Sequence, residues 1–340
     1  METYFKKSIR EARLLDHTDG FKEKTIPVEI RTDLLLEITA RVLQFRRKLP
    51  KMSYDALLIE KSKKTCPFCP ERLDTSTPKF APSLSAKGRM GHGQAMVLPN
   101  AFPYSRYSGV VIFSEDHYIP LDEFTPKIVL DSLIASTIYI NQVRKADPNV
   151  TYASINWNYM PPSGSGIIHP HLQVVVNQRP TRFHQKVITA SLNYQKNRRK
   201  NYWSDLISWE KRHQVRYLFH KGTVVFLVSF CPRGMFGEVL SIFQSKNLLQ
   251  QIDEEEWCYF AKGLSRILKC FHHLNFDSLN MTLLASLTKE EDCWVQARII
   301  PRSSLPPWST SDVNYFEKGH DEMIVILSPE DLADEIRKSA

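Results

Sequence analysis

The same succession of predicted elements occurs twice along this chain of 340 residues. Strand, strand, helix, strand, loop and strand follow one another between residues 95 and 177, and the order returns between residues 222 and 301. Hairpin-like links between the strands favour antiparallel pairing. The sequence therefore predicts an α+β fold that contains one unit twice, in residues 1–180 and 181–340, with antiparallel sheets flanked by helices.

Apolar periodicity defines each predicted element. In the first unit we predict a helix at residues 126–145 and strands at 95–98, 109–113, 152–158 and 169–176. In the second we predict a helix at 254–273 and strands at 222–228, 236–243, 279–284 and 294–301. Outside the repeat, we expect a helix at 34–49, a loop over 73–95 and helix in part of 178–214.

Composition limits the location and the partners. No apolar run approaches the ~20 residues that cross a bilayer, and the first residues lack the apolar core of a secretion signal. We therefore expect a cytoplasmic protein without membrane contact. The net charge of +8 suits a phosphorylated substrate, and equally a weak affinity for nucleic acid, so charge alone decides neither.

The six cysteines are not expected to form disulfides in a long cytosolic chain. Cys66 and Cys69 have the spacing of half a zinc site, although a redox pair has the same spacing. Because no second Cys-x-x-Cys follows, histidines must complete a metal site, which would then be tetrahedral, closed and structural. The candidate histidines are His92, His117, His169, His171 and those near the C-terminus, and four cysteines are expected in the core: Cys231, Cys258, Cys270 and Cys293.

A loop of glycine and serine runs into a predicted strand that is apolar except for three polar side chains. Side chains alternate along a strand, so His169, His171 and Gln173 are predicted to share one face. The preceding loop can bring backbone N–H groups close to an anion. A neutral imidazole can attack phosphorus, and an amide can hold a phosphoryl oxygen without activating water, which favours transfer over hydrolysis. The alternative is a pair of ordinary buried histidines with satisfied hydrogen bonds.

From about residue 40 to about residue 330, the chain resembles the galactose-1-phosphate uridylyltransferase family, the transferase branch of the histidine-triad (HIT) superfamily. The motifs that carry the resemblance are Cys66-x-x-Cys69, Asn100-Ala101-Phe102-Pro103, Ser114-Glu115-Asp116-His117, Asn158, and Gly164-Ser165-Gly166-x-x-His169-Pro170-His171-x-Gln173. The resemblance implies one structural Zn²⁺ held by Cys66, Cys69, His117 and His169, and a nucleophile at His171. It also implies a phosphate-orienting amide at Gln173 and substrate-binding residues Arg46, Asn100, Phe102, Asn158, Gly164 and Ser165.

The second unit departs from that family. Trp294 and Gln296 stand where the family often has two histidines, and residues 183–192 contain no acidic side chain where a glutamate is expected. The family's second metal site is therefore expected to be absent. His320 stands where an aromatic residue is common, so the resemblance does not identify the acceptor. Leu172 replaces a glycine that is frequent in the family, but its side chain should face away from the site.

The resemblance implies a nucleotidyltransferase of carbohydrate, specifically galactose, metabolism. It would move a nucleoside monophosphate, UMP by this resemblance, from a nucleotide sugar to a sugar 1-phosphate through a covalent adduct on His171. One alternative is an adenylyl-transferring sugar-nucleotide phosphorylase. Another is a non-catalytic, zinc-stabilised protein that binds nucleotides or nucleic acid, although a nucleic-acid partner is not expected. Members of the family are often dimers, so a homodimer is one expected state.

Overall fold

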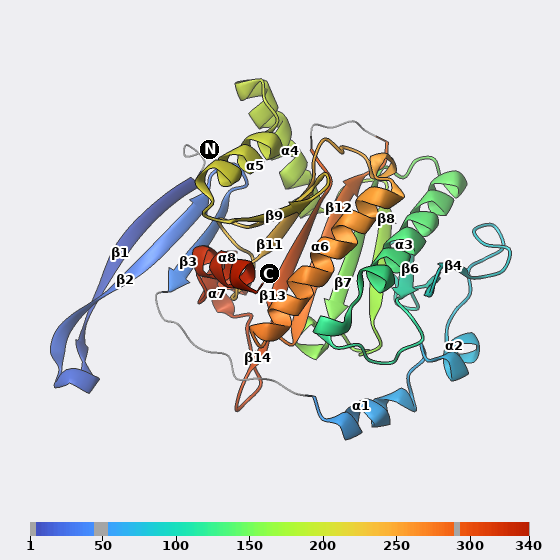
Figure 1. Cartoon of the computed structure of the whole chain (residues 1–340), viewed down its shortest axis with the longest axis horizontal. Helices are drawn as coiled ribbons and strands as arrows, with labels where there is room; N and C mark the ends of the chain where they lie inside the picture. The colour runs from blue at the N-terminus through green and yellow to red at the C-terminus, as the bar shows by residue number, and fades with distance from the viewer. Residues whose placement is uncertain (1–4, 44–53, 289–292, 340) are drawn as a thin grey trace.

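The structure, a computed structural model, describes residues 5–43, 54–288 and 293–339, and one antiparallel sheet dominates it (Figure 1). The strand order is β4-β5-β6-β8-β7-β12-β13-β11-β10-β9. The strands of the first half are β4 (Met90–His92), β5 (Ala95–Pro99), β6 (Tyr107–Ile112), β7 (Tyr152–Tyr159) and β8 (His171–Asn177). Those of the second half are β9 (Tyr217–Lys221), β10 (Val224–Val228), β11 (Val239–Phe243), β12 (Ser278–Ser286) and β13 (Gln296–Arg302).

The two halves of this sheet have the same internal order. β5-β6-β8-β7 in the first corresponds to β10-β11-β13-β12 in the second, and the halves meet where β7 pairs with β12. The α+β class and the antiparallel pairing of this sheet agree with the sequence prediction. We propose that the two halves are copies of one unit that divide near residue 180.

Two long helices, α3 (Pro126–Ala146) and α6 (Glu254–His273), lie side by side on one face of the sheet (Figure 1). Thr125 caps the first through the Ile128 amide, and Asp253 and Glu256 form a capping box at the second. Both helices were predicted, to within one residue at each end, because long apolar stripes and caps are strong local signals. Their apolar faces close the main core over Trp157 and Phe226.

Gly263 marks the tightest contact between α6 and the sheet. A Cβ atom at this position would lie 2.2 Å from the Phe226 ring. We expect Gly263→Ala to lower the free energy of unfolding by about 1–3 kcal/mol, because overpacking outweighs the better helix propensity of alanine. Urea unfolding of the variant measures this loss. Gly319→Ala, whose Cβ would meet nothing within 4 Å, is the control, and an equal effect of both substitutions would contradict the packing argument.

The other face of the sheet is partly covered by α4 (Arg182–Arg198) and α5 (Tyr202–His213). They enclose a second apolar cluster that contains Trp203 from α5 and Leu240 from β11. Because side chains alternate along each strand, this cluster takes the residues that do not face α3 and α6. The first half of this face carries the polar side chains of β7 and β8, which form the site described below.

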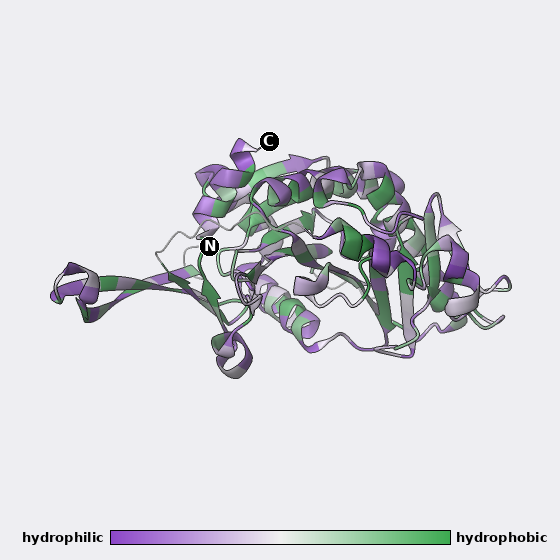
Figure 2. Cartoon of the chain, turned by 90° about the horizontal axis from the view of Figure 1, so that it is seen from below, coloured by the Kyte–Doolittle hydropathy of each residue, from purple (hydrophilic) through white to green (hydrophobic). Residues whose placement is uncertain are grey.

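Three N-terminal strands and one strand near the C-terminus form a second, four-stranded sheet, and its long N-terminal hairpin extends away from the rest of the chain (Figure 2). The strands are β1 (Phe5–Asp16), β2 (Lys22–Asp33), β3 (Ile38–Leu43) and β16 (Glu322–Val325). The predicted helix at residues 34–49 is therefore wrong over its described part. Ala40 and Val42 are buried on one face of β3, and pairing with β2 and β16 overrides the helical spacing.

Shorter elements complete the described chain. The helices are α1 (Ala56–Lys63), α2 (Pro70–Ser76), α7 (Tyr315–His320) and α8 (Pro329–Lys338), and a small hairpin joins β14 (Ser304–Leu305) to β15 (Thr310–Ser311). The loop predicted over residues 73–95 is corrected, because the end of α2 and strand β4 lie within it. None of the described helices is both long and apolar enough to cross a membrane.

Candidate functional site

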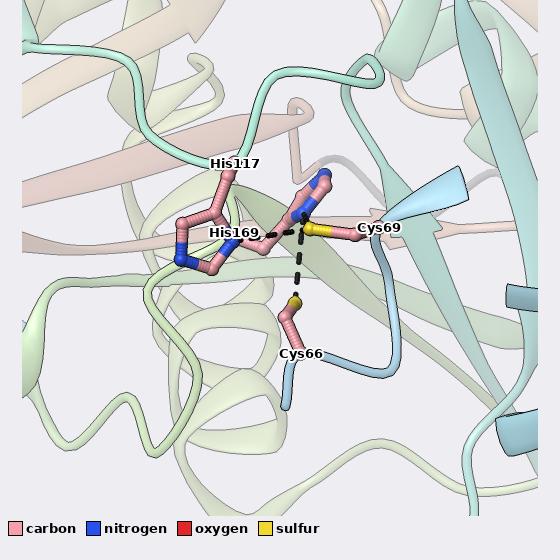
Figure 3. A group of neighbouring side chains, drawn as sticks. All are labelled: Cys66, Cys69, His117 and His169. Atoms are coloured by element: carbon pink, nitrogen blue, oxygen red, sulfur yellow. Dashed lines mark hydrogen bonds between the residues drawn. The ribbon is translucent and has the colours of Figure 1, made fainter. Parts of the chain in front are cut away.

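Cys66, Cys69, His117 and His169 come together in the folded chain although up to 103 residues separate them. All four side chains are buried, and their ligand atoms all lie within 4.8 Å of one another (Figure 3). Sγ of Cys69 is 3.3 Å from Nδ1 of His117, and both thiol sulfurs are 3.7 Å from Nδ1 of His169. Tetrahedral zinc with ordinary bond lengths would place sulfur and nitrogen ligands about 3.6 Å apart. The cluster therefore has the donor set and the spacing of a closed Cys2His2 zinc site.

Hydrogen bonds fix both imidazoles in the tautomer that a metal needs. Nε2 of His169 donates to the Ser114 carbonyl at 2.9 Å, which leaves the Nδ1 lone pair facing the thiols. Nε2 of His117 lies 2.8 Å from the Ser62 hydroxyl. Because that hydroxyl gives its own proton to the Ile59 carbonyl, it can only accept from His117, whose Nδ1 is again free. Ser62 and Ser114 were not predicted to take part, although Ser114 belongs to the same motif as His117, because their hydrogen bonds to the two rings depend on the folded arrangement.

Burial sets the protonation states of the cluster. It lowers the pKa of His169 to about 4 and also lowers that of His117, so both rings are neutral and ready to bind a metal. Burial, together with the neighbouring Cys66 thiol, raises the pKa of Cys69 to about 12. Metal binding at this position would therefore release a proton. The Phe68 amide, 3.4 Å from Cys66 Sγ, is placed to stabilise a thiolate there.

His171 is the first residue of strand β8 and follows His169 of the cluster by two residues. Its Nδ1 donates to the His169 carbonyl oxygen at 2.8 Å, so Nε2 carries the lone pair. Burial lowers the pKa of His171, which keeps the ring neutral. The Phe68 ring meets the imidazole edge-on, with centroids 5.2 Å apart. An oriented neutral imidazole with a free Nε2 is a nucleophile.

The predicted face of the histidine strand needs one correction. β8 starts at His171, so His169 lies in the preceding loop rather than on the strand, and it turns toward the thiols. Pro170 interrupts the ladder because it has no amide hydrogen. His171 and Gln173 do share a face, and Asn158 of the neighbouring strand faces the same way, because Trp157 and Leu172 are paired and point into the opposite core.

The glycine–serine loop lies between β7 and β8. Gly164 has φ +90°, a left-handed conformation that favours glycine, and the loop around it is open, since a Cβ there would meet nothing within 4 Å. The Ser165 hydroxyl donates to the Ile167 carbonyl at 2.6 Å, so its oxygen lone pairs remain for a ligand. The Gly164 amide already donates to the Pro161 carbonyl at 2.8 Å, which leaves the Ser165 and Gly166 amides as the candidate anion donors. This backbone can bind an anion next to His171.

Two predicted binding residues, Asn100 and Phe102, are not brought to His171. Arg46 lies outside the described residues. The Asn100 amide bonds the Ser108 carbonyl, at the opposite end of β6 from Ile112, which pairs with His171. Asn100 uses its side-chain oxygen to accept the Phe102 amide, and the Phe102 ring is 84 % exposed. A role for these residues stays a prediction.

In the second half, Gln296 stands at the position of His171. It pairs with Ile242 as His171 pairs with Ile112. Gln296 is 1 % exposed, and neither amide atom has a hydrogen-bond partner among the described residues. Nearby Arg298 is committed to a 2.6 Å ion pair with Glu238. The described residues of the second half therefore offer no nucleophile at the position that His171 occupies in the first half.

No family model matches the chain. It is 29 % identical over 335 residues to an uncharacterized protein of Archaeoglobus fulgidus, and the match covers 98 % of each chain. Among solved structures, an ADP-glucose phosphorylase from Arabidopsis thaliana with bound ADP-glucose superimposes with a TM-score of 0.69 at 19 % identity, over 92 % of this chain and 99 % of that one. A uridylyltransferase gives a TM-score of 0.65 at 19 % identity, over 91 % and 98 %.

The chain therefore has the fold of the uridylyltransferases and their HIT-like relatives, as the sequence resemblance implied. A galactose-1-phosphate-uridylyltransferase-like protein of Arabidopsis thaliana has the same fold, with a TM-score of 0.67 at 19 % identity, over 92 % of this chain and 99 % of that one.

Proposed function

We propose that this protein is a nucleotidyltransferase that moves a nucleoside monophosphate from a nucleotide sugar to a sugar 1-phosphate, with His171 as the covalent carrier. The observation that carries the proposal is the His171 ring, oriented through Nδ1 so that Nε2 is free, beside an open loop of glycine and serine. The shared fold supports it, since the similar structures include a phosphorylase of ADP-glucose and uridylyltransferases.

The reaction would proceed in two displacements. Nε2 of His171 attacks the α-phosphorus, a P–N bond forms, and the bond from phosphorus to the bridging oxygen breaks, which releases the sugar 1-phosphate. A second sugar 1-phosphate then attacks the adduct and restores the free imidazole. Asn158, Ser165 and the amide of Gln173 would hold the phosphoryl oxygens as charge moves through them. Gln173 offers no basic group to activate water, which favours transfer.

The four-residue cluster fits Zn²⁺, and we propose that it binds one such ion. Bound there, the ion would be structural, because two thiolates and two imidazoles leave no open position. Its ligands Cys66 and Cys69 flank Phe68, and His169 supplies the carbonyl that orients His171. The cluster would thus hold both the ring and the hydrogen bond that position the nucleophile.

An adenylyl-transferring phosphorylase is the second candidate, and the likeness to an ADP-glucose phosphorylase favours it. It would use the same adduct, with inorganic phosphate in place of the sugar 1-phosphate as the acceptor. The two candidates differ in the base of the donor and in the acceptor. Neither changes the role proposed for His171.

Intact-mass spectrometry after mixing the protein with UDP-glucose, ADP-glucose or GDP-glucose tests the function. We expect a mass gain of one nucleoside monophosphate, mapped by peptide analysis to His171. Adding galactose 1-phosphate or inorganic phosphate should then remove the adduct and identify the acceptor. If no donor leaves an adduct, the protein is not a transferase of this kind, and nucleotide binding without turnover would indicate the non-catalytic alternative.

The contact between Phe68 and His171 gives a further prediction. We expect Phe68→Leu to slow adduct formation by about 10-fold, because the ring no longer limits rotation of the imidazole. Phe80→Leu is the matched control: it removes a buried ring stacked on Tyr139 in the main core. Rapid-quench rates should separate the two variants while zinc content stays constant. Equal rates of adduct formation in the two variants would show that Phe68 does not position His171.

A further inference from the structure

Asn280, a residue of the second half of the sheet, contacts the candidate site. This residue lies on β12 directly opposite Asn158 of β7, where the two halves meet. Its Nδ2 donates to Asn158 Oδ1 at 2.8 Å and to the Ser163 carbonyl, at the start of the open loop, at 2.9 Å. A residue of the second half therefore bonds both to Asn158, which is proposed to bind the phosphoryl group, and to the loop beside it.

Arg302 of β13 determines which way the Asn280 amide points. Its Nη1 donates to Asn280 Oδ1 at 2.5 Å, while Nε and Nη2 donate to the two carboxylate oxygens of buried Asp312 at 2.7 and 2.6 Å. A guanidinium has only donors, so the Asn280 atom that faces it must be oxygen. The Asn280 nitrogen then has to face Asn158.

The same reasoning applies to the next amide. Because Asn280 presents a donor, Asn158 must offer its oxygen in return. The Nδ2 group of Asn158 is left pointing away, and within the described part of the chain it donates to no other group. The series from Asp312 through Arg302 and Asn280 therefore forces Asn158 to present N–H donors rather than a carbonyl oxygen.

We propose that Arg302 and Asn280 are positioning residues that lock the Asn158 amide with its N–H group toward the transferring phosphoryl group. This inference rests on the proposed function. An amide free to rotate would present its oxygen to the phosphate for part of the time, which would repel the anion. A fixed donor costs no reorganisation when charge develops in the transition state. The second half, which lacks the two histidines, thus serves the single site of the first.

The test measures adduct formation in single turnover with the nucleotide sugar that labels the wild type. We expect Asn280→Leu, which keeps the volume and removes the donor, to slow the step at saturating donor by about 10- to 100-fold, with a smaller change in donor affinity. Arg302→Met should act in the same direction, and Arg302→Lys should lose less because the ammonium still donates. Asn201→Leu, which removes an amide that caps α5, is the control and should leave the rate unchanged.

A double-mutant cycle separates positioning from general damage. In an Asn158→Ala background, Asn280→Leu should slow the step by no more than about 3-fold, because the group it orients is gone. If the rate losses of Asn158→Ala and Asn280→Leu multiply in the double variant, the inference is overturned. A wild-type rate in both Asn280→Leu and Arg302→Met would also overturn it. If the wild type itself forms no adduct with any donor, the proposed function fails and takes this inference with it.

Discussion

His171→Asn is expected to abolish the covalent adduct and to lower nucleotidyl transfer by at least about 10³-fold. Asparagine can still donate to the His169 carbonyl, as Nδ1 of His171 does at 2.8 Å, so the local backbone should survive. What it lacks is the Nε2 lone pair that forms the P–N bond. Intact mass and steady-state rates with the labelling donor measure the loss.

The control for this substitution is His184→Asn. His184 is also a buried histidine whose pKa burial lowers, to about 4, and its ring contacts Tyr152 rather than the candidate site. We expect this variant to keep the adduct and most of the rate. An adduct that persists in His171→Asn would show that another residue is the nucleophile. Equal losses of rate in both variants would show that the effect comes from lost packing.

Removal of the metal ligands is expected to have the largest effect on stability. Cys69→Ser should release zinc and lower the free energy of unfolding by about 3 kcal/mol or more, because it removes a ligand from a site that links α2, the Ser114–His117 turn and the loop before β8. Elemental analysis measures the zinc, and urea unfolding with and without chelator measures the stability.

Cys270→Ser is the matched control for the zinc prediction. Cys270 is equally buried, but its thiol faces the Ile336 carbonyl of α8 and none of the four cluster residues. This variant should keep its zinc and lose stability only through packing. A Cys69→Ser protein that retains one zinc per chain would disprove the assignment of the cluster.

Much of the site could be predicted from the sequence because its chemistry is carried by closely spaced motifs. The Cys66-x-x-Cys69 spacing indicated half a metal site, the family resemblance supplied His117 and His169, and the structure brings these four residues together. The two long helices were predicted for a similar reason, since their stripes and caps are local. Roles for Arg46, Asn100 and Phe102 were transferred by resemblance alone, and they remain untested.

Features that depend on distant partners could not be predicted. The helix expected at residues 34–49 fails because β3 pairs with strands on both sides, one of them almost 300 residues later in the chain. The bond from Asn280 to Asn158 depends on the register of β12 against β7, which no local pattern gives. The sequence predicted a strand at residues 279–284 but not the strand that pairs with it.

The pairing of β7 with β12 also makes each half of the chain a poor fragment. Separated near residue 180, the first half would expose an eight-residue strand and the second a nine-residue strand, each with unpaired backbone groups along its length. Such open edges lead to aggregation. A second half without catalytic histidines therefore still covers an edge of the first half that would otherwise be open.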